Sequence, residues 1–91
     1  MKVENMTSSN GNKVANQFIL FDSEFTAFQS YGSVIVKTGF VDGKRQVWLD
    51  ETYWDYSKTT GKYRNQFLGE TKKETEKKIK SGVYILADLN S

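Results

Sequence analysis

The chain has 91 residues, 14% of them aromatic, and a formal net charge of +2. This length fits one domain with one small core, and the aromatic content is typical of a folded chain rather than a disordered one. The chain has neither His nor Cys, which excludes Ser–His and Cys–His nucleophiles, thiolate or imidazole metal sites, and disulfide bonds.

The first 16 residues are polar and contain the turn-forming run TSSNGN without any periodicity. We therefore expect a polar N-terminal arm over residues 1–16 and a single α+β domain over residues 17–91. No apolar run approaches the roughly 18 residues of a membrane span, and the N-terminus lacks the apolar region of a signal peptide. The sequence predicts a soluble, cytoplasmic protein without a membrane partner.

Four short strands are predicted after the arm, because their segments have β-branched or alternating apolar residues and end at turn residues. The segments are 17–22, 24–30, 33–38 and 46–50. Asp42-Gly43 favours a hairpin turn, since Gly takes the positive φ that such turns need. The short connections indicate an antiparallel meander, because a parallel crossover needs about a dozen residues.

A helix is predicted next, because four residues recur at the spacing of one helix face. They are Tyr56, Thr60, Tyr63 and Phe67. Asp55 or Ser57 can cap its N-terminus, and Gly69 stands where a left-handed C-cap belongs. We expect the aromatic residues of this face to belong to the core rather than to a stacking platform.

A second helix and a final strand complete the predicted fold. Thr71 and Glu74 have the spacing of a capping box, and Gly82 ends the helix. The final segment alternates, which predicts a strand whose inward side chains are Val83, Ile85, Ala87 and Leu89. The expected architecture is a small antiparallel sheet of order β-β-β-β-α-α-β, with two consecutive helices packed on one face.

Acidic residues cluster only in the run LDETYWD, as Asp50, Glu51 and Asp55. Such a group can hold a hard cation, but acids that follow a strand and precede a helix commonly serve as caps. We favour the cap. We therefore predict no metal, no cofactor and no catalytic residue, and we do not expect an enzyme.

Positive charge gathers in the helical part of the chain, where eight of the 13 Lys and Arg residues lie between residues 57 and 82. Projection on the two helices places six of them as a candidate surface for phosphates or for an acidic protein: Lys58, Lys62, Arg64, Lys73, Lys77 and Lys80. The alternative is a solvated face that binds nothing. No DNA-binding motif or aromatic RNA-binding pattern accompanies the lysines.

Four stretches carry a resemblance to a known family. They are NMTSSNGNKVANQF at 5–18, FQSYGSVI at 28–35, YWDYSKTTGKYRNQFLGE at 53–70, and the KKIKSG…LADLN tail at 77–90. The chain resembles a family of short bacteriophage proteins, related to versions on other mobile elements, that is known as a domain of unknown function. The resemblance implies a small accessory phage protein expressed in the bacterial cytoplasm, and it implies no activity.

We expect such a protein to act by binding, with a host or defence-system protein as its partner. The alternative is direct, largely sequence-nonspecific nucleic-acid binding through the basic helical surface at 58–80. A structural or self-assembling accessory protein is the third class. The sequence leaves the partner and the oligomeric state open.

Overall fold

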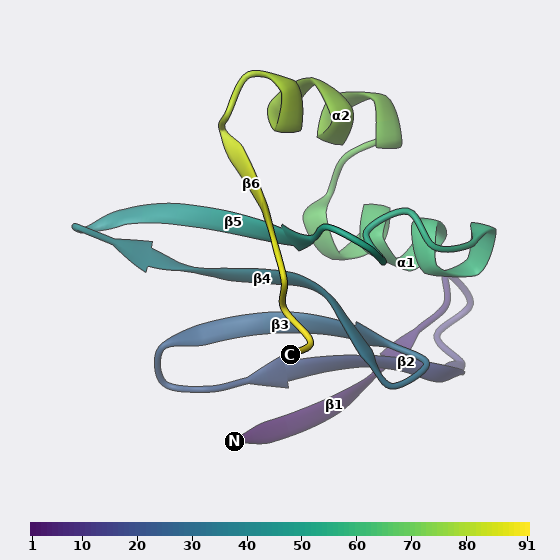
Figure 1. The fold of residues 1–91 in the computed structure, drawn as a ribbon. Coiled ribbons are helices and arrows are strands. Elements are labelled where there is room, and N and C mark those ends of the chain that lie inside the picture. The colour runs from purple at the N-terminus through teal and green to yellow at the C-terminus, as the bar shows by residue number, and fades with distance from the viewer.

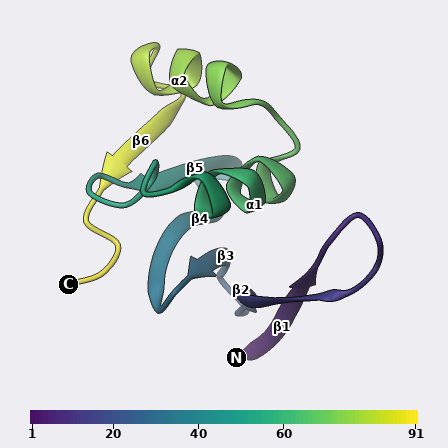
Figure 2. The same ribbon diagram turned by 90° about the vertical axis from the view of Figure 1, so that its right-hand side faces the viewer.

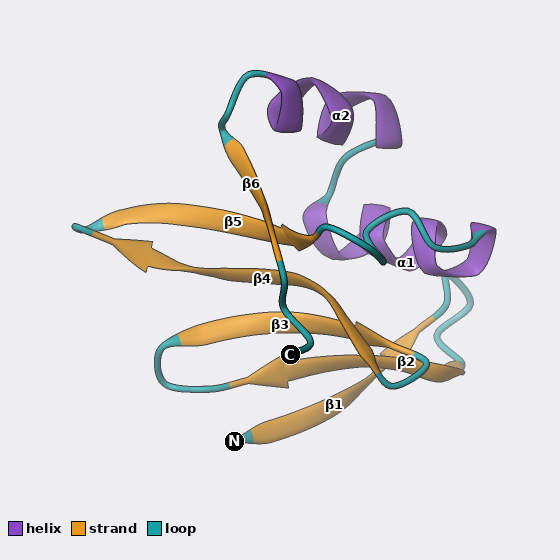
Figure 3. Cartoon of the chain, in the orientation of Figure 1, coloured by secondary structure: helices purple, strands orange, loops and turns teal.

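Six strands form one twisted sheet in the order of the chain, in a computed structural model that describes residues 1–91 (Figures 1 and 3). The strands are β1 (Lys2–Thr7), β2 (Lys13–Phe21), β3 (Phe25–Ser30), β4 (Ser33–Val41), β5 (Lys44–Asp50) and β6 (Tyr84–Ala87). Neighbours from β1 to β5 pair antiparallel, and β6 pairs parallel to β5. The α+β class, the meander and the two consecutive helices are thus as predicted.

The N-terminal segment is part of the sheet, which corrects the expected arm over residues 1–16. β1 pairs with β2, and the TSSNGN run makes the turn between them, with the amide of Ser8 donating to Asn12 O at 2.8 Å. The strand was missed because Met6 is its only buried residue. A polar edge strand shows no alternation of apolar residues, although its backbone pairs with the neighbouring strand on one side.

Two helices connect β5 to β6, and this long connection is what allows the two strands to run parallel. They are α1 (Lys58–Leu68) and α2 (Lys72–Lys80). Ser57 caps α1 by accepting the amide of Thr60 at 3.1 Å, and Gly69 ends it with a φ of 70°. Thr71 and Glu74 form the predicted capping box of α2. Gly82, with a φ of 82°, follows the last residues of α2, so local capping chemistry sets all four helix ends where the sequence indicated.

The core lies between the sheet and α1. A register row across four strands supplies its floor: Ile19, Phe28, Val36 and Leu49. The ring of Phe67 stacks on Phe28 with centroids 6.0 Å apart, and Tyr63 is buried beside them. Tyr56, predicted on the same helix face, lies before α1 and is 59% exposed. The aromatic spacing placed it in the helix, but α1 begins two residues later, at Lys58.

The inward residue of β6 is Tyr84, which corrects the prediction that Val83 and Ile85 face the core. Tyr84 donates its hydroxyl to Glu70 Oε1 at 2.6 Å, and Lys78 donates to the same oxygen at 2.9 Å. Thr75 donates to the other Glu70 oxygen at 2.7 Å. This polar network joins the packing of Ile79 on the core in holding α2 against β6, so hydrophobic alternation alone indicated the wrong face of the strand.

We predict that Phe67→Ala lowers the free energy of unfolding by about 3 kcal/mol, the lower end of the range for a buried phenylalanine, because the ring is only partly buried on Phe28. Urea unfolding measures the change. Phe40→Ala is the matched control, since that ring is 75% exposed and its loss should change the unfolding midpoint little. Equal midpoints for the two variants would contradict the placement of Phe67.

We also predict that the contribution of Glu70 to the free energy of unfolding depends on pH. Burial opposes its ionisation, but hydrogen bonds from Tyr84, Lys78 and Thr75 outweigh burial and hold the pKa of Glu70 below its ordinary value. A lowered pKa stabilises the fold above the unfolded-state value of about 4.3, and this stability is lost as pH falls through the folded-state value. Glu70→Gln should cost on the order of 2 kcal/mol at neutral pH and much less near pH 3. A cost that is independent of pH would rule the network out as the cause.

Candidate binding surface at the first helix

The start of α1 is fixed to the sheet by a chain of hydroxyl groups. Ser57 Oγ donates to Thr60 Oγ1 at 3.2 Å, and Thr60 Oγ1 lies 2.9 Å from Ser30 Oγ on β3. Thr60 and Ser30 are buried, so the contact between them is shielded from water, whereas Ser57 is exposed. The first turn of α1 is therefore held in one position, together with the side chains that point outward from it.

A cleft lined only by polar, charged or glycine residues runs along α1 to the first turn of α2, and we call it the lysine cleft. Its lining residues are Asp55, Ser57, Lys58, Gly61, Lys62, Arg64, Asn65 and Lys72. Four of them are cations and one is an anion, so the cleft carries an excess of positive charge. Two cations come from the exposed side of α1, and Lys72 brings a third from α2, which sequence analysis had not included.

Arg64 is the buried wall of this cleft, which corrects its prediction as an exposed contact. Its side chain is 1% exposed. Nη1 donates to the carbonyl of Trp54 at 2.8 Å and to Asp55 Oδ1 at 3.3 Å, while the guanidinium lies 5.3 Å from the Trp54 ring centroid. The guanidinium lies over Gly61, where an added Cβ would meet Nη2 at 3.5 Å, an ordinary van der Waals contact. Arg64 therefore holds the loop before α1 in place, and its buried charge adds to the positive charge of the cleft.

Asp55 closes one side of the cleft by joining the two helices. It accepts from Lys72 Nζ at 2.7 Å as well as from Arg64. Burial opposes the ionisation of Asp55, but the hydrogen bonds and charges of Lys72 and Arg64 outweigh burial and hold the pKa of Asp55 below its ordinary value. Asp55 is thus an anion at neutral pH, and Lys58 and Lys62 are left without a carboxylate partner.

The remaining predicted lysines lie elsewhere. Lys73, Lys77 and Lys80 are exposed on α2, on the side opposite its buried residue Thr75, and none of them lines the lysine cleft. The structure therefore divides the predicted basic surface into a cleft with three lysines and a separate stripe.

Two exposed tyrosines form a hollow beside the cleft, and we call it the tyrosine hollow. Its lining residues are Tyr31, Tyr56, Ser57 and Thr59. Tyr31 is 52% exposed in the turn between β3 and β4, and Tyr56 packs edge to face on Tyr53 at 5.8 Å. Ser57 lines both hollow and cleft, so the rings and the lysines belong to one continuous surface.

Of the acidic residues at the end of β5, Asp50 caps backbone amides, whereas Asp55 forms ion pairs and Ser57 is the N-cap of α1. Asp50 is buried and accepts the amides of Thr52, Tyr53 and Leu89 at 3.0, 2.8 and 2.9 Å. Burial opposes its ionisation, but these hydrogen bonds outweigh burial and hold the pKa of Asp50 below its ordinary value. No group of three or more acidic side chains in the chain is arranged to hold a metal ion.

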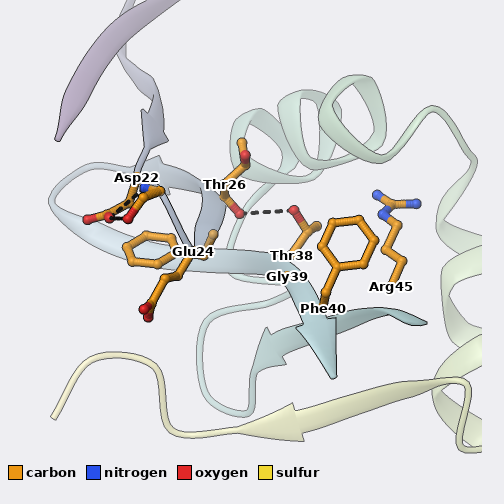
Figure 4. Close-up of a pocket in the computed structure, with 9 residues that line it drawn as sticks. Asp22, Glu24, Thr26, Thr38, Gly39, Phe40 and Arg45 are labelled. Carbon is orange, nitrogen blue, oxygen red and sulfur yellow. Dashed lines mark hydrogen bonds between the residues drawn. The ribbon is translucent and has the colours of Figure 1, made fainter. Parts of the chain in front are cut away.

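A further hollow lies at the end of the sheet, between the β2–β3 turn and the β4–β5 hairpin (Figure 4). Thr38 donates to the carbonyl of Thr26 at 3.1 Å, and the Ser23 amide donates to Asp22 at 2.7 Å. Figure 4 shows the carboxylate of Glu24 pointing away from Arg45. The polar groups of this hollow serve the turn and the strands and do not converge on one point.

A family model matches residues 1–82, and it describes a Family of unknown function (DUF8033). The chain belongs to this family. No curated protein and no solved structure matches it. None of its helices is long and apolar enough to cross a membrane. The family model includes the whole lysine cleft and the tyrosine hollow, since both end before residue 82.

We predict that Arg64→Met destabilises the protein by roughly 2–3 kcal/mol, because it removes hydrogen bonds from a charged group and leaves the Trp54 carbonyl without its donor. Lys62→Met is the control, since that side chain is exposed and has no carboxylate partner. Thermal or urea unfolding compares the two. If both variants unfold like the parent, Arg64 does not organise the cleft.

Proposed function

We propose that this protein acts by binding another protein, through the continuous surface of the lysine cleft and the tyrosine hollow. The observation that supports this most strongly is that Ser57 borders both, so two exposed aromatic rings adjoin several cations. Tyrosine and other aromatic side chains are enriched in protein interfaces and at their energetic hot spots. The matching partner surface is acidic, with an apolar group that the tyrosines can cover.

The resemblance of the chain to short phage proteins gives the proposal its biological setting. A phage or mobile-element product in the bacterial cytoplasm meets host proteins and defence complexes, and we propose one of these as the partner. We propose binding without catalysis, and the structural roles of the two buried or ion-paired acids near the cleft support this: Asp50 accepts backbone amides, and Asp55 pairs with Arg64 and Lys72.

A second candidate function is nucleic-acid binding through the same surface. Exposed aromatic rings beside lysines are also the combination that stacks bases and binds phosphates. Asp55 favours a protein partner, because its carboxylate lies among the lysines of the cleft and repels a phosphate backbone. A protein surface can instead match this arrangement of positive and negative charges with ion pairs of its own.

Affinity capture from bacterial lysate tests the proposal with three forms of the protein. The parent should retain a protein partner, before and after nuclease treatment. Lys58→Glu/Lys62→Glu should weaken capture and slow association about tenfold or more at low salt, because complementary charge mainly accelerates encounter. Lys73→Glu/Lys77→Glu is the matched control with the same change in charge, and it should bind like the parent.

The outcomes separate the candidates. Loss of capture after nuclease, with a steep fall of affinity in salt, would favour nucleic acid instead. Equal capture by the parent and by both double variants would reject the lysine cleft as the contact surface.

A further inference from the structure

The sheet face opposite α1, which we call the open face, carries a row in register across all six strands that is apolar in every strand except β4, where Lys37 stands. Its members are Val3, Leu20, Ala27, Lys37, Trp48 and Ile85. The row alternates with the core row, so it points away from α1. Neither helix covers this face. Only the C-terminal tail, residues 88–91, crosses it. The tail passes in front of β4 in Figure 1, and in Figure 2 it lies on the opposite side of β4 from α1.

The open face is hollowed along its centre. One groove runs beside the tail and is mostly apolar, with Leu20, Phe25 and Val34 in its lining. A second hollow continues from it toward Trp48 and the exposed ring of Phe40. Phe25 and Lys37 line both, so the two are parts of one groove. An antiparallel sheet with a solvated outer face normally presents polar residues there, and a contiguous apolar surface instead marks an interaction site.

Three charged side chains border this groove, Lys37, Asp88 and Glu24, and none of them has an ion-pair partner. Lys37 holds its ammonium over two rings, 5.1 Å from the Phe25 centroid and 5.6 Å from that of Trp48. Asp88 lies on the tail and accepts the Asn90 amide at 3.1 Å. No carboxylate lies within 4.0 Å of Lys37, and no cation lies within 4.0 Å of Asp88.

We propose that the open face pairs with the open face of a second copy of this chain, as a two-fold symmetric dimer. In such an interface each residue contact occurs twice, so the surface must be complementary to itself. The open face meets this condition because its half-buried apolar centre is bordered by charges of both signs, the cation of Lys37 and the anions of Asp88 and Glu24. Lys37 of each copy then pairs with Asp88 of the other, and the Phe25, Trp48 and Leu20 side chains become buried.

The lysine cleft cannot play this role. Its free charges, Lys58 and Lys62, have the same sign, so two copies of it would repel each other. The charges therefore suit the two surfaces to different partners. The lysine cleft suits an acidic surface of another protein, and the open face suits a second copy of this chain.

The size of the face is also suitable. Six strands about 4.8 Å apart, roughly 13 Å long in β6 and 20–30 Å long in the others, give an area on the order of 500–700 Å². A standard stable interface buries about 800 Å² on each partner. The face therefore has approximately the area that one dimer needs, and sheets pack face to face about 10 Å apart with their side chains interdigitated.

Sedimentation equilibrium over a concentration series tests the proposal with two single variants. The parent should be a reversible dimer. Lys37→Glu and Asp88→Lys should each be largely monomeric, with dimer dissociation constants raised about tenfold or more, because each creates two like-charge contacts. Mixing the two variants should restore dimers to near parental strength, since the mixed dimer again contains two opposite-charge pairs.

A second pair of variants separates this contact from a general attraction between oppositely charged proteins. Lys62→Glu and Glu76→Lys change the net charge equally but lie on the helices. Each should dimerise like the parent, alone or mixed. A parent that stays monomeric at every concentration would overturn the proposal, as would dimers that neither Lys37→Glu nor Asp88→Lys weakens. Failure of rescue in the mixture would overturn the Lys37–Asp88 pairing.

Discussion

The burial of the Arg64 charge is the constraint from which the arrangement around α1 follows. A buried cation is tolerated only when it is paired and hydrogen-bonded, so the loop before α1 must bring the Trp54 carbonyl and Asp55 to it. Asp55 then has a second oxygen free, and Lys72 binds it at 2.7 Å. Through this one carboxylate the first turn of α2 is fixed beside α1, and the lysine cleft between them is a consequence.

The two faces of the sheet differ because α1 covers the row of side chains on one face and no helix covers the neighbouring row on the other. The row through Phe28 and Val36 is covered by α1 and forms the core. The row through Ala27 and Trp48 is as apolar in composition but has no helix above it. The polar network of Glu70 holds α2 at the β6 edge, away from the open face. A sheet with two apolar faces and helices on only one is an incomplete sandwich, and this is the physical basis for expecting a second copy there.

Sequence patterns predicted the elements whose signals are local. Capping residues, the hairpin glycine and β-branched runs act within a few positions, so the central strands and both helices could be predicted. The burial of a side chain could not be predicted where it depends on partners far away in the sequence. Arg64 looks like one more exposed helix cation until Trp54 and Asp55 are placed around it. Tyr84 faces inward because Glu70, 14 residues away, accepts its hydroxyl. The polar strand β1 is visible only through its pairing with β2.

A single buried carboxylate links the two proposed surfaces. Asp50 accepts the amides of Thr52 and Tyr53, which begin the loop leading to Asp55 and the lysine cleft, and also the amide of Leu89, next to Asp88 on the tail. Asn90 then binds both backbone groups of Val34, which fixes the tail across the open face. The position of the Asp88 charge and the position of the loop before α1 therefore depend on the same hydrogen bonds. A change that loosens Asp50 would disturb both surfaces at once, whereas changes at Lys37 or Lys62 act on one surface only.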